Sequence, residues 1–164
     1  MTAGSHTEDI LHDKICSHSL STTLKVYLPF LKLNKNEWVV VDEKAGADAV
    51  TTGIPSGFDY AVIVVEPRPQ SIAVAKNIAK LLSFYETPVR YLGNKINTPQ
   101  EKNEIENEIN AKLSACIPFH SEFHPELLND LSSLLDTFTQ EPSPLTRKER
   151  SLLKVKRNKE YSNY

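Results

Sequence analysis

Apolar positions in the first third of the chain change from a helical to an extended period. Between residues 20 and 31, leucines and a tyrosine recur every three or four positions, which predicts an amphipathic helix that Pro29 interrupts. After a polar turn at 34–36, a continuous β-branched run at 37–42 predicts a buried strand ending at Asp42. Glycines and a proline within 43–59 predict a long loop that can contain one helical turn.

Strands and helices alternate in the rest of the chain. Short apolar runs predict strands at 60–65, 89–92 and 115–118, and helical periods follow each of them, the last one at 125–138. This alternation predicts right-handed βαβ units. The predicted fold class is α/β: a partial doubly wound, mainly parallel sheet flanked by helices on both faces.

Two of these helices carry a start signal. Thr98-Pro99-Gln100-Glu101 is a capping box with proline at the first helical position. Ser71 is placed to begin the helix between the strands at 60–65 and 89–92. The apolar side predicted for that helix consists of Val74, Ile78, Leu81, Leu82 and Tyr85.

Composition and charge divide the chain into three parts. With 40% hydrophobic and 24% charged residues among 164, the chain is typical of a soluble globular protein. We predict a flexible segment at 1–18, a folded domain at 19–140 and a basic tail at 141–164. Residues 145–164 hold seven basic and two acidic side chains, against 12 and 19 in the rest. We expect a solvated tail, mobile or loosely helical, without membrane contact, because few apolar residues accompany its charges.

The net charge and composition of the whole chain argue against several classes of protein. A net charge of −2 argues against a nucleic-acid binder. Two cysteines, a polar N-terminus and the lack of a long apolar stretch favour the cytoplasm. His120 and His124 have the i, i+4 spacing of a metal pair only if their segment is helical, which Pro125 disfavours, and we predict neither a metal site nor a catalytic residue.

Candidate binding residues follow the predicted strands, because ligands of parallel α/β sheets bind at the carboxyl ends of the strands. Asp42 ends the first strand, where it either binds a magnesium-coordinated water or caps the next turn. Asn94-Lys95 follows another strand; the amide can pair with a purine edge while the lysine stem packs over the ring. Asn97 offers only one acceptor where guanine selection needs a carboxylate, which favours adenine. The alternative for this segment is a solvated turn.

Several short motifs in order resemble one family. They are Trp-Val-Val-Val-Asp-Glu-Lys-Ala-Gly at 38–46, a strand ending in Glu66-Pro67, Ser71 with the following helix, Asn94-Lys95, and Ile117-Pro118. Over residues 16–138 the chain resembles the second half of MinD/ParA-type P-loop ATPases. It is most similar to the CooC-like branch, the nickel-insertion ATPases of carbon monoxide dehydrogenase maturation.

The resemblance implies roles for particular residues and a nucleotide cofactor, ATP with magnesium. Asp42 and Gly46 would belong to the segment that senses the γ-phosphate and magnesium. Asn94 and Lys95 would contact adenine, and the loop at Pro118 would flank the base. The branch also places a Cys-x-Cys metal site near Cys16, but position 14 is lysine here, so this metal site is not expected. Lys44 stands where the branch usually has glutamate.

The chain contains no P-loop. None of its five glycines precedes Lys-Ser/Thr at the required spacing, and the family's first strand would lie upstream of Met1. We therefore expect a truncated ATP-binding domain that neither binds ATP tightly nor hydrolyses it alone. Its partners would be a chain that supplies the P-loop half, a second copy, or a target metalloenzyme. The alternative is a non-enzymatic protein-interaction module that retains the fold, and a receiver-like domain with Asp42 as phosphoacceptor is a weaker third hypothesis.

Overall fold

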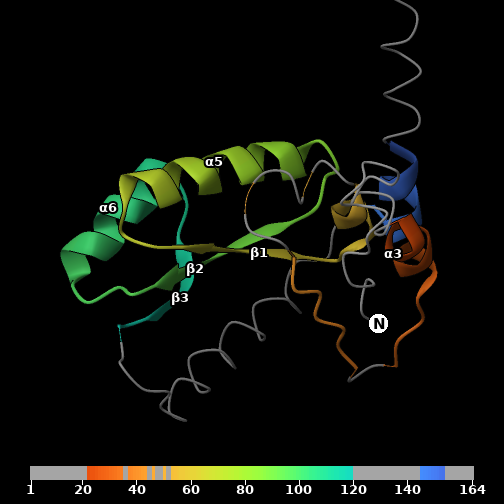
Figure 1. Cartoon of the computed structure of the whole chain (residues 1–164), viewed down its shortest axis with the longest axis horizontal. Coiled ribbons are helices and arrows are strands. Elements are labelled where there is room, and N and C mark those ends of the chain that lie inside the picture. Colours follow the sequence, from red (N-terminus) through yellow and green to blue (C-terminus); the bar gives the residue numbers. More distant parts are fainter. Residues whose placement is uncertain are drawn as a thin grey trace, which may run out of the picture.

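The structure, a computed structural model, describes residues 22–34, 37–43, 46, 50, 53–119 and 145–153. Three parallel strands, β1 to β3, form its sheet, and two longer helices, α5 and α6, connect them (Figure 1). The elements in chain order are α3 (Thr22–Tyr27), the 3-10 turns η1 (Leu28–Phe30) and η2 (Ile54–Gly57), β1 (Ala61–Val65), α5 (Pro69–Ser83), β2 (Val89–Asn94), α6 (Pro99–Ile109), β3 (Leu113–Ile117), and a helical segment at 147–153.

The sheet has the order β1-β2-β3, and both pairs of neighbours run parallel. This arrangement confirms the predicted α/β class with a parallel sheet flanked by helices. A parallel pair needs a crossover connection, which α5 and α6 supply. Both helices lie over the same face of the sheet (Figure 1), so they do not confirm the predicted helices on both faces, which stays a prediction. All three strands therefore end at the same edge, next to the first turns of α5 and α6.

The core lies between this helical layer and the sheet. In β1, Ile63 and Val65 are buried while Val62 and Val64 are exposed, as the two-residue period of a strand requires. On α5 the buried positions are Ala75 and Leu82, so the prediction that Val74 is buried was wrong. Val74 lies one residue, or 100° of helical rotation, away from the face that Ala75 presents to the sheet. From α6, Ile105 completes the core.

The two helix starts differ in how well the sequence predicts them. The capping box of α6 is confirmed: the Thr98 side chain accepts from the backbone N–H of Glu101, whose carboxylate accepts from the N–H of Thr98. For α5 the predicted start at Ser71 was wrong, because the helix begins at Pro69, whose ring fixes the backbone angle of a first helical turn. The Ser71 hydroxyl instead accepts from the backbone N–H of Glu66 at 2.9 Å.

The strand predicted at residues 37–42 is absent. Residues 37–43 adopt neither helix nor strand, and the side chains of Trp38 and Val40 are 53% and 89% exposed. A strand needs a neighbour that supplies its hydrogen bonds, and no strand in the described part of the chain pairs with this segment. At the start of this segment, Glu37 N–H donates to the carbonyl of Asn34 at 3.1 Å.

Pro29 divides the first helix as predicted, so that α3 ends at Tyr27 and η1 follows.

The helical segment at 147–153 packs against these amino-terminal elements. Arg150, which the sequence places in a solvated tail, is 1% exposed and donates to backbone carbonyls of Ser56 and Phe58 beside η2. Figure 1 shows this segment next to α3, at the end of the sheet where β1 begins. Residues 145–153 are therefore part of the folded body.

Other sequence predictions fall outside the described residues. The helix expected at 125–138, the flexible segment at 1–18 and the end of the tail after residue 153 belong to this group. Among the helices that the structure describes, none combines the length and apolar character needed to cross a bilayer.

Candidate functional site

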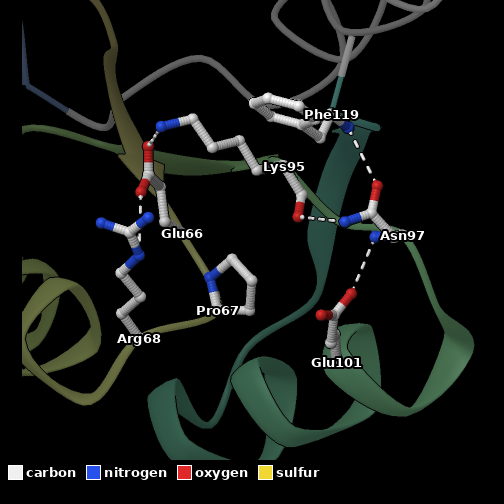
Figure 2. Close-up of a pocket in the computed structure, with 7 residues that line it drawn as sticks. All are labelled: Glu66, Pro67, Arg68, Lys95, Asn97, Glu101 and Phe119. Carbon is white, nitrogen blue, oxygen red and sulfur yellow. Dashed lines mark hydrogen bonds and ion pairs between the residues drawn. The ribbon is translucent and has the colours of Figure 1, made fainter.

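A pocket of about 320 Å³ opens at the carboxyl ends of the strands. It is lined by residues that directly follow β1, β2 and β3 and by the first turn of α6 (Figure 2). The lining residues are Glu66, Pro67, Arg68, Lys95, Asn97, Glu101 and Phe119. This is the edge where ligands bind in parallel α/β sheets, and the volume lies at the lower end of the range for small-molecule sites.

One carboxylate and two cations form the charged wall of the pocket. The Lys95 ammonium lies 2.7 Å from Oε1 of Glu66, and Arg68 Nε lies 3.6 Å from Oε2 of the same carboxylate. The hydrogen bond from Lys95 holds the pKa of Glu66 below its ordinary value, so this group is an anion at neutral pH. The carboxylate has acceptor capacity beyond these two partners.

A second set of contacts fixes the opposite wall. Asn97 Oδ1 accepts from the backbone N–H of Phe119 at 3.1 Å, and Asn97 Nδ2 donates to the carbonyl of Lys95 at 3.4 Å. The carboxylate of Glu101 accepts from the backbone N–H groups of Asn97 and Thr98 at 2.7 and 3.0 Å. These bonds tie the segment after β3 to the loop after β2, so Asn97 and Glu101 build the frame of the pocket.

The loop after β2 depends on a tight backbone path. A Cβ at Gly93 would lie 2.8 Å from Ile96 Cγ1 and 2.9 Å from Leu113 Cδ1, so only glycine fits there without movement. Lys95 adopts a positive φ of 61°, and the N–H of Ile96 donates to the carbonyl of Ile117 at 3.0 Å. The loop thereby turns back toward β3 and directs Lys95 across the pocket toward Glu66 (Figure 2).

The five residues predicted from the sequence lie in different places. Lys95 lines the pocket; Asn94 is the last residue of β2, opposite Ile117 of β3; and Pro118 comes between β3 and the lining residue Phe119. Asp42 and Gly46 do not line the pocket: Asp42 is exposed in the segment 37–43, and Gly46 adopts a φ of 102°. The structure thus brings the base-side candidates together at one edge of the sheet.

The sequence analysis missed several lining residues individually, although it predicted that binding residues follow the strands. Glu66 directly follows an apolar strand and precedes a proline, which is a usable signal for a carboxylate at the ligand edge. Phe119 carries a ring that is 60% exposed, one residue beyond the predicted Pro118. The position of Phe119 at the pocket depends on the hydrogen bond with Asn97, a residue 22 positions away that no local sequence pattern connects to it.

The chemistry of the pocket favours a planar, polar-edged ligand. Its two cations and two carboxylates balance in charge, so it offers little net attraction to a free anion. The rings of Pro67 and Phe119 provide apolar surface, while Glu66 and Lys95 provide an acceptor beside a donor. Within the described residues, no cluster of three or more histidine, cysteine, aspartate or glutamate side chains could hold a metal ion.

The chain is thus an α/β protein with a pocket, a candidate ligand site, at the carboxyl edge of its parallel sheet. A stretch of 107 residues is 28% identical to an uncharacterized ATP-binding protein of Methanocaldococcus jannaschii. This stretch covers 65% of the present chain and 43% of that relative, so the chain spans less than half of the relative's length. No protein-family model matches the chain, and no solved structure matches it.

Proposed function

We propose that this chain is a nucleotide-binding domain that holds the adenine base of ATP in the pocket at the carboxyl ends of β1, β2 and β3. The observation that carries the proposal is the position of Lys95 and Phe119, which follow neighbouring parallel strands and line one pocket at the ligand edge of the sheet. The similarity to an ATP-binding protein supports the choice of ligand.

The lining residues suit a base better than a phosphate chain. An aromatic ring with an exposed face stacks on a base, and a lysine stem packs over its opposite face. The balanced charges and the lack of a glycine-rich loop leave the pocket poor in phosphate-binding groups. Phosphate contacts would then come from residues outside the lining of this pocket.

The proposal includes a relation to one family of ATPases. We infer a relation to the MinD/ParA-type P-loop ATPases, closest to their CooC-like branch, in which Asp42 and Gly46 would act on the phosphate and magnesium side. Both residues lie outside the pocket lining, so that side of the site would assemble with further residues. A separate chain that carries the P-loop half, or a second copy of this chain, would be the partner. Weak binding and no ATP hydrolysis are expected of the chain alone.

A protein-interaction module without nucleotide is the second candidate function. It is favoured by the apolar run at 38–41, where Trp38, Val39 and Val40 are exposed. Exposed apolar residues that follow one another in sequence are typical of a surface that another protein covers. This function requires no ligand in the pocket, so a binding measurement separates the two candidates.

The test is a calorimetric titration of the chain with ATP and ADP in the presence of magnesium, with two phenylalanine variants. Phe119→Ala removes the ring at the pocket, and Phe30→Ala removes a ring of similar exposure, 60% against 62%, on η1 at the other end of the sheet. We expect Phe119→Ala to weaken binding by about 5- to 100-fold, the contribution of one base–aromatic stack, and Phe30→Ala to leave it unchanged.

Two results contradict the nucleotide proposal. If the chain gives no heat with millimolar ATP, the pocket does not bind a nucleotide and the interaction module becomes the better candidate. If both phenylalanine variants weaken binding equally, the nucleotide binds elsewhere or the loss reflects general destabilisation. Thermal unfolding of each variant distinguishes these last two causes.

A further inference from the structure

The ion pair between Glu66 and Lys95 spans the pocket. It joins the residue after β1 to the residue after β2 over 2.7 Å, and the lysine stem lies extended between them (Figure 2). The stem is thereby placed along the pocket instead of projecting into solvent. The nearby Arg68 contacts the other oxygen of the same carboxylate and so keeps Glu66 between two cations.

Lys95 needs such a contact to hold one conformation. Its side chain is 39% exposed, and an exposed lysine samples many rotamers because its stem has four flexible bonds. Glu66 is better fixed: its side chain is 23% exposed, and its backbone N–H donates to the hydroxyl of Ser71 in the first turn of α5. The more rigid carboxylate therefore orders the more flexible cation.

We propose that Glu66 is a positioning residue, which holds the Lys95 stem as one wall of the base pocket. This inference rests on the proposed nucleotide site. Since the carboxylate neutralises the ammonium, Lys95 contributes its apolar stem to the ligand more than its charge. A base would then pack on a stem that is ordered before the ligand arrives, and binding would not have to pay for that ordering.

A double-mutant cycle tests this role through the affinity for ATP. Glu66→Gln removes the negative charge that holds the ammonium while it conserves side-chain size, and we expect affinity to fall by about 2- to 10-fold, the effect of one side chain that must be ordered on binding. Lys95→Met keeps an apolar stem that needs no counter-ion. In the Lys95→Met background, Glu66→Gln should therefore change the affinity by less than about 1.5-fold, which is strong coupling between the two sites.

A second ion pair provides the matched control. Lys76 on α5 and Glu108 on α6 form an ion pair of 3.1 Å that lies outside the pocket lining. Glu108→Gln makes the same chemical change as Glu66→Gln, and it should leave ATP affinity unchanged in both backgrounds. Thermal unfolding of all variants checks that each retains the fold.

The possible failures are distinguishable. If Glu66→Gln weakens ATP binding equally in both backgrounds, Glu66 acts on the ligand without Lys95 and the positioning role is refuted, while the nucleotide site stands. If Glu66→Gln has no effect in the wild-type background, the positioning role is refuted as well. If the wild-type chain binds no ATP, the proposed function fails and this inference fails with it.

Discussion

The buried Arg150 makes the strongest prediction about stability. Its guanidinium donates to three backbone carbonyls, those of Ser56, Phe58 and Leu145, and it is 1% exposed. Arg150→Ala removes these charge-assisted bonds and leaves the three oxygens without that partner. Each such bond contributes about 1.5–3 kcal/mol. Because one cation makes all three and its desolvation opposes them, the total is smaller than their sum.

We expect Arg150→Ala to lower the free energy of unfolding by about 3 kcal/mol. For a domain of this size each kcal/mol corresponds to about 2–4 °C, so the melting temperature should fall by about 6–12 °C. Arg150→Lys keeps the charge but replaces the planar fork with a single ammonium, which cannot reach all three oxygens. It should therefore lose most of the same stability, which separates the geometry of the guanidinium from its charge.

The neighbouring Arg147 is the control. Its side chain is 25% exposed and donates to one carbonyl, that of Leu31, at 2.9 Å, with an exposed Asp59 at 3.5 Å. Arg147→Ala should cost only about 1 kcal/mol, because its single charge-assisted bond and its ion pair lie at a partly exposed site, where solvent weakens both. Thermal unfolding followed by circular dichroism measures all variants. If Arg150→Ala shifts the melting temperature by less than about 2 °C, or no more than Arg147→Ala, the helical segment at 147–153 is not held as described.

Two further predictions concern α6 and the loop before it. Burial opposes ionisation of Glu106, but hydrogen bonds from Lys112 and the N–H of Leu113 outweigh it and hold its pKa below the ordinary value. This stabilisation is present above the unfolded pKa of about 4.3 and is lost as pH falls through the lower folded pKa. Glu106→Gln should therefore cost about 1 kcal/mol at pH 7 and much less near pH 3, measured by thermal unfolding at both pH values. Asn97→Asp should not create a preference for GTP over ATP, because Oδ1 at this position accepts from Phe119 N–H; tight GTP binding by this variant in a titration would contradict that reasoning.

Local signals in the sequence were sufficient for most of the fold. The strands β1, β2 and β3 follow from short apolar runs, and α6 begins at its capping box because the partners of that motif are only three residues apart. The strand expected at 37–42 shows the limit of this reasoning. Its residues have the composition of a buried strand, yet a strand forms only beside a second strand. The local sequence does not reveal whether such a partner exists.

The candidate site was predictable as a region more than as a set of side chains. The carboxyl ends of parallel strands meet at one edge, so the segments after β1, β2 and β3 had to come together. Which side chains then face one another depends on register and on loop conformation. Glu66 reaches Lys95 because the loop after β2 turns at a residue of positive φ, and Phe119 is held by Asn97 because β3 ends beside that loop.

Arg150 and Lys95 lie at opposite ends of the sheet, and they differ in exposure and in their partners. Arg150 is buried and bonded to main-chain oxygens on several segments, so its hydrogen-bonding capacity serves the fold. Lys95 is 39% exposed, has one carboxylate partner and lines a pocket. From the sequence alone both residues are simply positive charges, and Arg150 was even assigned to a basic tail. The number and kind of partners, which only the tertiary structure provides, separate the buried Arg150 from Lys95, a cation of the pocket lining.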